Sequence, residues 1–246
     1  MPLEKLSGIV LRYADYRDND RILTVFTREK GKLSIASRGC KRQNSPLQSA
    51  SQLFAYSEMV AYSGRGKYSL NSADLCEAFY PLREDIVKFE CASFMLALSD
   101  FITGEEEPSE ALFTLLYHCL SYTAYSDMDP MDVSLCLAVR ALTVSGYSPK
   151  LTSCVRCGAK LNDRRRVRFA PQLGGSVCND CSGEHMEVSA LTLEAMRRMS
   201  LLEDKQLRNV RLPSEVRREL TAVVKAYYLC IYDGVERCFD ILARAK

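Results

Sequence analysis

The chain has 246 residues, of which 47% are hydrophobic, so it is long enough to bury an apolar core in one large domain or in two or three small ones. A charged fraction of 26% and a net charge of +2 are ordinary values, and overall charge therefore does not indicate a nucleic-acid binder. No apolar run approaches the roughly 18 to 20 residues of a membrane span, and the segment after Met1 lacks an apolar signal core, which predicts a cytoplasmic protein.

Short runs of apolar residues with strand character, divided by turn signals, fill residues 3–80. Gly31 and Gly66 lie in sequences typical of hairpin turns. Five short antiparallel strands in about 80 residues fit a small β-barrel of the OB type, although an SH3-like barrel would give the same pattern. The expected strands are Leu6–Tyr13, Arg21–Thr27, Leu33–Ser37, Leu53–Tyr62 and Tyr68–Phe79.

From Pro81 the apolar residues recur with the period of a helix. The pattern predicts helices over residues 81–104, 109–125 and 129–146, the third with Pro130 at its first helical position. Residues 150–185 lose this periodicity and gain Gly, Cys and Arg, which is typical of a small inserted module. Helical pattern returns at residue 189, and a long amphipathic stretch over residues 216–242 is expected to bend at Gly234.

The sequence therefore predicts an α+β protein in four segments. Residues 1–80 form a five-stranded OB-type barrel, and residues 81–149 and 186–246 form the two parts of an α-helical domain. Residues 150–185 form a module inserted between these two parts. Charge differs between the segments: residues 1–80 hold 12 Lys/Arg against 8 Asp/Glu, whereas residues 81–149 hold 3 against 11. Different regions are thus expected to meet different partners.

Two cysteine pairs carry the clearest chemical signal. Cys154 and Cys157 are separated by two residues, as are Cys178 and Cys181, and twenty residues lie between the pairs. This spacing lets four thiolates surround one Zn²⁺ tetrahedrally and leaves no open position for catalysis, so the zinc is expected to be structural. Two disulfides, four incidental thiols, or His185 as a substitute ligand are the alternatives.

Basic residues gather in the expected barrel. Residues 28–67 contain eight basic residues and only two acidic ones. Most of the basic residues lie in or beside turns, where long side chains reach phosphates. A second cluster lies in the expected zinc module. A solvated surface with no ligand is the alternative in both places. The candidate DNA-binding residues are Arg28, Lys30, Lys32, Arg38, Lys41, Arg42, Arg65 and Lys67 in the barrel, and Arg164, Arg165 and Arg166 in the module.

The sequence offers no pattern of a known catalytic site. It has no phosphate-binding P-loop, no nucleophile elbow and no dinucleotide fingerprint, and it holds only two histidines. His118 falls among apolar helical residues, where a packing role is expected. We therefore expect no enzymatic activity.

Several of these runs together resemble the RecO family of bacterial recombination mediators. In the barrel they are Gly8–Tyr13, Asp20–Ser34 and Arg38–Arg42 with Ser45. In the second half they are Gly146–Pro149 and Phe169–Gly175, which flank the two cysteine pairs. The order and separations match across residues 5–185, and the helical pattern extends the resemblance to the end.

The resemblance implies an OB barrel packed on a helical domain that carries the zinc module. It also implies binding of single- and double-stranded DNA and annealing of complementary strands. The implied partners are RecR, the single-stranded-DNA-binding protein and, indirectly, RecA, in the bacterial cytoplasm at the nucleoid. Two other functions remain open from the residues themselves. One is an RNA-binding or transcription factor built from a barrel and a zinc ribbon, and the other is an assembly scaffold that uses the acidic segment.

Overall fold

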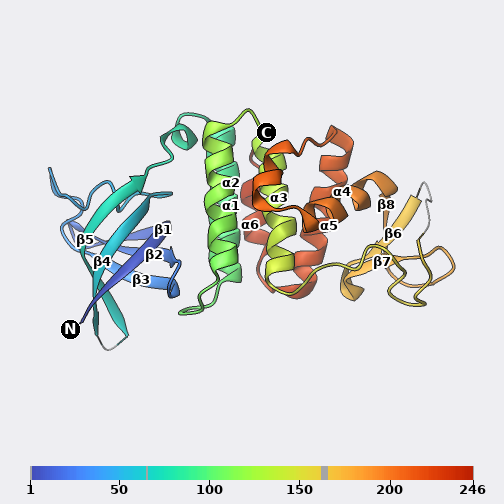
Figure 1. The fold of residues 1–246 in the computed structure, drawn as a ribbon, viewed down its shortest axis with the longest axis horizontal. Helices are drawn as coiled ribbons and strands as arrows, with labels where there is room; N and C mark the ends of the chain where they lie inside the picture. Colours follow the sequence, from blue (N-terminus) through green and yellow to red (C-terminus); the bar gives the residue numbers. More distant parts are fainter. Residues whose placement is uncertain (1, 65, 162–165, 246) are drawn as a thin grey trace.

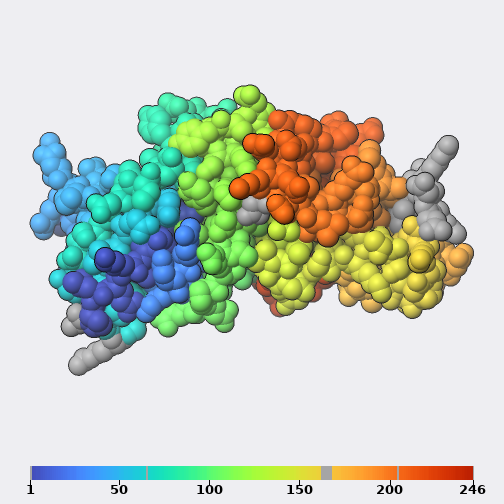
Figure 2. Space-filling model, viewed as in Figure 1, coloured from blue at the N-terminus to red at the C-terminus, as the bar shows by residue number. Residues whose placement is uncertain are grey.

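The computed structural model describes residues 2–64, 66–161 and 166–245, and its arrangement is an elongated series of three parts (Figure 1). A β-barrel lies at one end, helices fill the middle, and a small sheet lies at the other end. The space-filling view shows the same order, with the helices separating the two β-rich ends (Figure 2). Among the described helices, none has the length and apolar character needed to cross a membrane.

The first five strands close into a barrel in the order β1-β2-β3-β5-β4. All neighbours are antiparallel except β3 and β5, which pair in parallel only at Ile35 with Tyr68 and at Ala36 with Ser69. This closed order with one parallel pair is that of an OB-type barrel, as the sequence predicted. The strands are β1 (Leu3–Tyr16), β2 (Asp20–Thr27), β3 (Gly31–Ser37), β4 (Tyr56–Gly64) and β5 (Lys67–Glu77).

Residues 53–55, which the sequence placed in the fourth strand, belong to a turn before it. Phe54 adopts a positive φ of 68° there and its ring packs edge-on against Phe89, with centroids 5.6 Å apart. Tertiary packing thus overrides the strand propensity of this segment. The barrel has an apolar interior of its own, and a second set of its side chains, including Ile9 and Phe26, joins the core of the helical part.

The helices follow the predicted order with one break that the sequence analysis missed. The first predicted helix divides into a short 3-10 turn, η1 (Tyr80–Arg83), and α1 (Ile86–Ile102). The break arises because Asp85 takes an extended conformation and caps α1, accepting hydrogen bonds from the backbone N–H groups of Val87 and Lys88. The others that precede the inserted module are α2 (Glu110–Tyr125) and α3 (Pro130–Val144).

After the inserted module the chain returns to the helical part. Ser189 caps α4 (Ala190–Leu201), a 3-10 segment η3 (Asp204–Asn209) follows, and α5 (Ser214–Ile231) crosses the core. The expected bend at Gly234 is a full interruption: Gly234 has a φ of 86°, and α6 (Glu236–Leu242) begins after it. A positive φ is available to glycine without steric cost, which lets the chain turn sharply there.

The inserted module contains a three-stranded sheet in the order β7-β6-β8. Its contact with the helices is aromatic, because the Phe169 ring meets Tyr227 of α5 with centroids 5.7 Å apart. Gly174 lies against the same tyrosine, where an added Cβ would come within 2.8 Å of the hydroxyl. The strands are β6 (Arg166–Ala170), β7 (Gly175–Val177) and β8 (Met186–Ser189), with the 3-10 turn η2 (Pro171–Leu173) between the first two.

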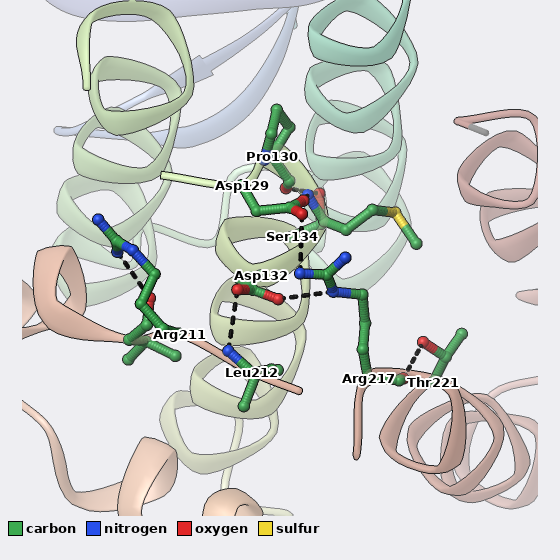
Figure 3. A network of polar contacts seen from close by, with 10 residues as sticks. Asp129, Pro130, Asp132, Ser134, Arg211, Leu212, Arg217 and Thr221 are labelled. Atoms are coloured by element: carbon green, nitrogen blue, oxygen red, sulfur yellow. Dashed lines mark hydrogen bonds and ion pairs between the residues drawn. The ribbon is translucent and has the colours of Figure 1, made fainter. Parts of the chain in front are cut away.

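A buried carboxylate ties the two parts of the helical region together (Figure 3). Asp132, in the first turn of α3, is fully buried. One of its oxygens accepts from the Arg217 Nε at 2.8 Å, and the other accepts from the backbone N–H of Leu212 at 3.1 Å. Arg217 also pairs with Asp129 at 2.7 Å. The network fixes the segment between η3 and α5 against the start of α3.

Replacing Asp132 by alanine should destabilise the protein. The change leaves the Leu212 N–H and part of the Arg217 guanidinium without a buried partner, although Arg217 keeps Asp129. We expect the free energy of unfolding in urea to fall by about 3 kcal/mol. Asp127→Ala, at an exposed acid in the preceding loop, is the control and should change stability by less than about 0.5 kcal/mol. Equal effects of the two changes would show that the network does not hold the fold.

Candidate metal centre and nucleic-acid interface

The four cysteines of the two predicted pairs meet at one point. Their sulfur atoms all lie within 4.8 Å of one another, and each cysteine is a free thiol. Cys154 and Cys181 are 3.9 Å apart at sulfur, and Cys157 and Cys178 are 3.6 Å apart. Four sulfurs at 2.3 Å from one Zn²⁺ in a tetrahedron are separated by about 3.8 Å, so the geometry fits this metal.

Backbone hydrogen bonds shape the first cysteine pair into a knuckle. The N–H of Gly158 donates to the Cys154 carbonyl, and Gly158 has a φ of 77°, which favours glycine. The N–H of Val155 donates to the Ser176 carbonyl, which brings the first knuckle to the strand that precedes the second pair. Gly175 is needed at this junction, because a Cβ would come within 2.4 Å of the Lys150 carbonyl oxygen.

The sulfur site is buried on one side and exposed on the other. Cys154 and Cys178 are buried, whereas Cys157 is exposed and Cys181 is half-buried. Burial by itself would raise the pKa of Cys154, but backbone N–H groups of Cys157, Cys178 and Arg156 donate to its sulfur, and the net result is a pKa of about 6. A thiol that ionises readily is suited to bind a metal ion. His185 lies outside this cluster, and its Nδ1 is 2.5 Å from the Gly183 carbonyl oxygen.

The predicted basic residues of the barrel fall into two groups. One group lies where the barrel meets acidic side chains: Lys30 pairs with Glu4 at 2.6 Å, and Lys32 pairs with Asp100 of α1 at 3.2 Å. Lys30 holds the pKa of the Glu4 carboxyl below its ordinary value. Arg28 extends over the Phe113 ring of α2 at 5.2 Å. These three cations are occupied by contacts within the protein.

The second group lies on the long connection between β3 and β4. Arg38 and Arg42 are exposed, and no acid in the described part of the chain pairs with either. Lys41 is exposed as well and bonds to Asp15 at 3.0 Å. Lys67 is exposed on β5 without a described ion pair. Arg65, Arg164 and Arg165 lie outside the described residues, and only the backbone of Arg166 is described, in β6.

The structure adds the β1–β2 hairpin to this second group, which the sequence analysis missed. The N–H of Lys41 donates to the Asn19 carbonyl, and the N–H of Gly39 donates to the Asp20 carboxylate, so the two loops lie side by side. Arg17 extends over the Tyr16 ring at 5.2 Å, and Arg21 covers the Tyr13 ring at 3.9 Å. The sequence feature that could have revealed this hairpin is Arg17, which directly follows Tyr16 at a turn. It lies outside the segment richest in basic residues.

Asp15 is the acid that forms described ion pairs with the cations of this surface, while the Asp20 carboxylate accepts from the Gly39 N–H. Lys41 and then Arg21 hold the pKa of the Asp15 carboxyl below the ordinary value by donating hydrogen bonds to it. Both pairs are solvent-exposed, where salt screens such interactions and makes them weak. We call this surface the basic loop surface. Its members are Tyr13, Tyr16, Arg17, Arg21, Arg38, Lys41 and Arg42.

A groove lies between α4, η3 and the start of α5, far from the barrel in the fold. It has a volume of about 480 Å³ and an apolar floor that includes Met199, Leu202 and Val216. Arg198 and Arg211 line it, together with one acid, Glu194. Arg197 and then Arg198 lower the pKa of Glu194 to about 2, and both arginines pair with this carboxylate at 2.7 Å. The groove therefore combines apolar contacts with an excess of positive charge.

Comparisons with known proteins agree with this architecture. The family description "Recombination protein O N terminal" matches residues 1–79, and "Recombination protein O C terminal" matches residues 83–234. The DNA repair protein RecO of Symbiobacterium thermophilum is 34% identical over 93% of this chain and 92% of its own length. The DNA repair protein RecO of Desulforamulus reducens is 32% identical over 92% of this chain and 89% of its own.

The RecO protein of Alkaliphilus metalliredigens is 29% identical over 99% of both chains. The two family matches together span both the barrel and the helical part with its cysteine module. The chain therefore belongs to the RecO family of DNA repair proteins.

Proposed function

We propose that this protein is a non-enzymatic recombination mediator that binds single- and double-stranded DNA and anneals complementary strands. In this proposal it acts with RecR to load RecA onto single-stranded DNA coated by the single-stranded-DNA-binding protein. The observation that carries the proposal is the basic loop surface, where exposed arginines that no described acid neutralises lie beside tyrosine rings on an OB-type barrel. Phosphates attract the cations, and unpaired bases can stack on the rings.

Each of the four segments has a separate role in this proposal. The barrel, residues 1–80, holds DNA through Arg38, Lys41 and Arg42, and Lys67 stands near the β4–β5 turn. Lys30 and Lys32 contribute less, because Glu4 and Asp100 already neutralise them. The cysteine module, residues 150–185, lies at the opposite end of the molecule (Figure 1), and its sequence includes Arg164, Arg165 and Arg166. A strand held there is separated from the barrel by the helices of residues 81–149 and 186–246.

The cysteine module binds one structural Zn²⁺ through Cys154, Cys157, Cys178 and Cys181. Four thiolates fill the coordination sphere, so the metal stabilises the module and has no position for a substrate. The small apolar cluster around Cys154 includes only a few buried residues, among them Ala170 and Val177. A module with so little buried apolar surface depends on its metal to fold.

The groove between α4 and α5 is the proposed contact for the single-stranded-DNA-binding protein. The acidic tail of that partner would place its carboxylates near Arg211, since Arg198 already pairs with Glu194, and its apolar side chains on Met199 and Val216. The acidic residues 81–149 would repel such a tail. The groove lies in residues 186–246, outside that acidic segment, which supports this assignment.

Metal analysis of the purified protein should find one zinc per chain. Cys154→Ser and Cys178→Ser each remove a buried ligand, so the content should fall to less than half and the module should become sensitive to proteolysis. Cys230→Ser, at an exposed cysteine on α5, is the control and should leave the zinc content unchanged. A protein that folds and resists proteases equally well with less than about 0.1 zinc per chain would contradict the assignment.

Replacing Arg38 and Arg42 by glutamine should weaken single-strand binding for any base sequence. Each lost phosphate contact should reduce the slope of log affinity against log salt by about 0.7, and annealing should fall with affinity. Lys30→Gln is the control and should leave the slope nearly unchanged, because Lys30 is already paired. An unchanged slope in the double variant would remove this surface from the DNA site. Competition by RNA of matched sequence tests whether DNA is the preferred ligand.

Arg211→Glu should weaken binding of a peptide that carries the acidic tail of the single-stranded-DNA-binding protein by about 10-fold, measured by fluorescence anisotropy. The matched control is Arg208→Glu, an exposed arginine in η3 that does not line the groove. Both variants change the total charge equally, so only a local contact separates them. Equal losses in the two variants would mean that the tail is attracted by overall charge and does not occupy the groove.

A further inference from the structure

The structure has a second pocket, and its surroundings are acidic, in contrast to the basic loop surface. It has a volume of about 280 Å³ and opens where the α1–α2 loop meets the ends of α3 and α5. In Figure 1 this is the region at the lower ends of α1 and α3. The polar residues that line it are Thr103, Glu107, Ser109, Ser145 and Tyr232. It shares no residue with the cysteine site or the groove described above.

Helix ends make this pocket electronegative. The chain enters it from the C-terminal ends of α1 at Thr103 and of α3 at Ser145, and α5 ends at the neighbouring Tyr232. None of these three helices has a basic residue in its last turn, so the partial negative charge of each C-terminus is not compensated there. The N-terminus of α2 also begins here, where Ser109 caps it and the Glu110 carboxylate in its first turn offsets its partial positive charge.

Carboxylates add to this negative potential. Glu105, Glu106 and Glu107 follow one another in the α1–α2 loop, Glu110 starts α2, and all four are exposed. No Lys or Arg in the described part of the chain forms an ion pair with any of them. Of the four, only Glu107 lines the pocket. Glu105 and Glu106 line a separate hollow beside Lys32 and Tyr68 of the barrel, so a cation bound in the pocket would meet one carboxylate directly.

The walls offer both hydrogen-bond acceptors and an aromatic face. Thr103 is 94% buried, since its exposed fraction is 6%, and its hydroxyl has no described hydrogen-bond partner although the residue lines the pocket. A buried hydroxyl without a partner costs free energy, which a donor from a ligand would recover. Tyr232 is held edge-on by Phe101 and Tyr147, with centroids 6.1 and 5.8 Å away. This aromatic cluster can support a cation–π contact.

The barrel holds the acidic loop in place. Glu106 has a φ of 56°, and its N–H donates to the Lys32 carbonyl of β3 at 3.1 Å. Gly31 lies directly against the Glu107 backbone, where a Cβ would come within 2.2 Å of the carbonyl oxygen. The loop is thus positioned before any ligand arrives, which lowers the entropic cost of binding.

We propose that this pocket receives an arginine side chain from a partner protein. A guanidinium group is planar, stacks on aromatic rings and offers five N–H donors, which suit the Glu107 carboxylate, the Thr103 hydroxyl and the Tyr232 ring together. A divalent metal ion would need several oxygen ligands of its own, and only one carboxylate lines the pocket. The site is a protein-docking contact that is separate from DNA binding and does not depend on it.

Titration of the ¹⁵N-labelled full-length protein with the peptide acetyl-Gly-Arg-Gly-amide tests the proposal. The peptide should shift the backbone resonances of Glu107 and Tyr232 with a Kd of about 1 mM or tighter. The same peptide with citrulline in place of arginine keeps the shape and loses the charge, and it should bind at least about 10-fold more weakly. The peptide with lysine in place of arginine should bind with an affinity between those of the arginine and citrulline peptides.

Glu107→Gln should weaken binding of the arginine peptide by about 10-fold, whereas Glu110→Gln, at a nearby exposed acid that does not line the pocket, should weaken it by less than about 3-fold. Both residues are exposed, so thermal melting should show intact folds. Equal binding of the citrulline peptide, no effect of Glu107→Gln, or no shift of the two resonances at about 10 mM peptide would overturn the proposal. Tighter binding of Ca²⁺ or spermidine than of the arginine peptide at the same resonances would also overturn it.

Discussion

The electrostatic organisation of this protein depends on two ion pairs of the Asp100 carboxylate, which lies at the end of α1. This carboxylate pairs with Arg12 of β1 at 2.7 Å and with Lys32 of β3 at 3.2 Å, so it joins the barrel to the helices. The same ion pairs remove two cations from the barrel surface. What remains positive on the barrel is its other end, where the β1–β2 hairpin and the β3–β4 connection meet.

The molecule thereby separates its charges by position. Arg17, Arg38 and Arg42, which have no described ion pair, lie on the basic loop surface, and the carboxylates of Glu105, Glu106 and Glu107, which also have none, lie in the α1–α2 loop. The acidic loop would repel a polyanion, so it limits the surface over which DNA can extend. Under the proposed function, DNA and a protein partner would bind at the same time, and this division would keep the two ligands from competing for one surface.

Packing at the junction makes this arrangement rigid. Phe26 of β2 meets Phe113 of α2 edge-on with centroids 5.6 Å apart, and barrel residues share a continuous apolar core with the helices. The buried Asp132 network has a comparable role at the far side of the helical part, where it fixes the segment that forms one wall of the α4–α5 groove. Each proposed binding surface is therefore supported by a well-packed part of the fold.

The sequence by itself determined the elements whose physical signal is local. The short strands in residues 3–80, the helix start at Pro130 and the paired cysteines all followed from spacing and residue type, because backbone geometry and metal coordination depend on near neighbours. The tertiary structure decided which cations stay free. Lys30 and Lys32 look like Arg38 and Arg42 in the sequence, but their partners Glu4 and Asp100 are distant along the chain. Pairing across 26 or 68 residues follows from the folded arrangement alone, since charge patterns do not specify which side chains will meet.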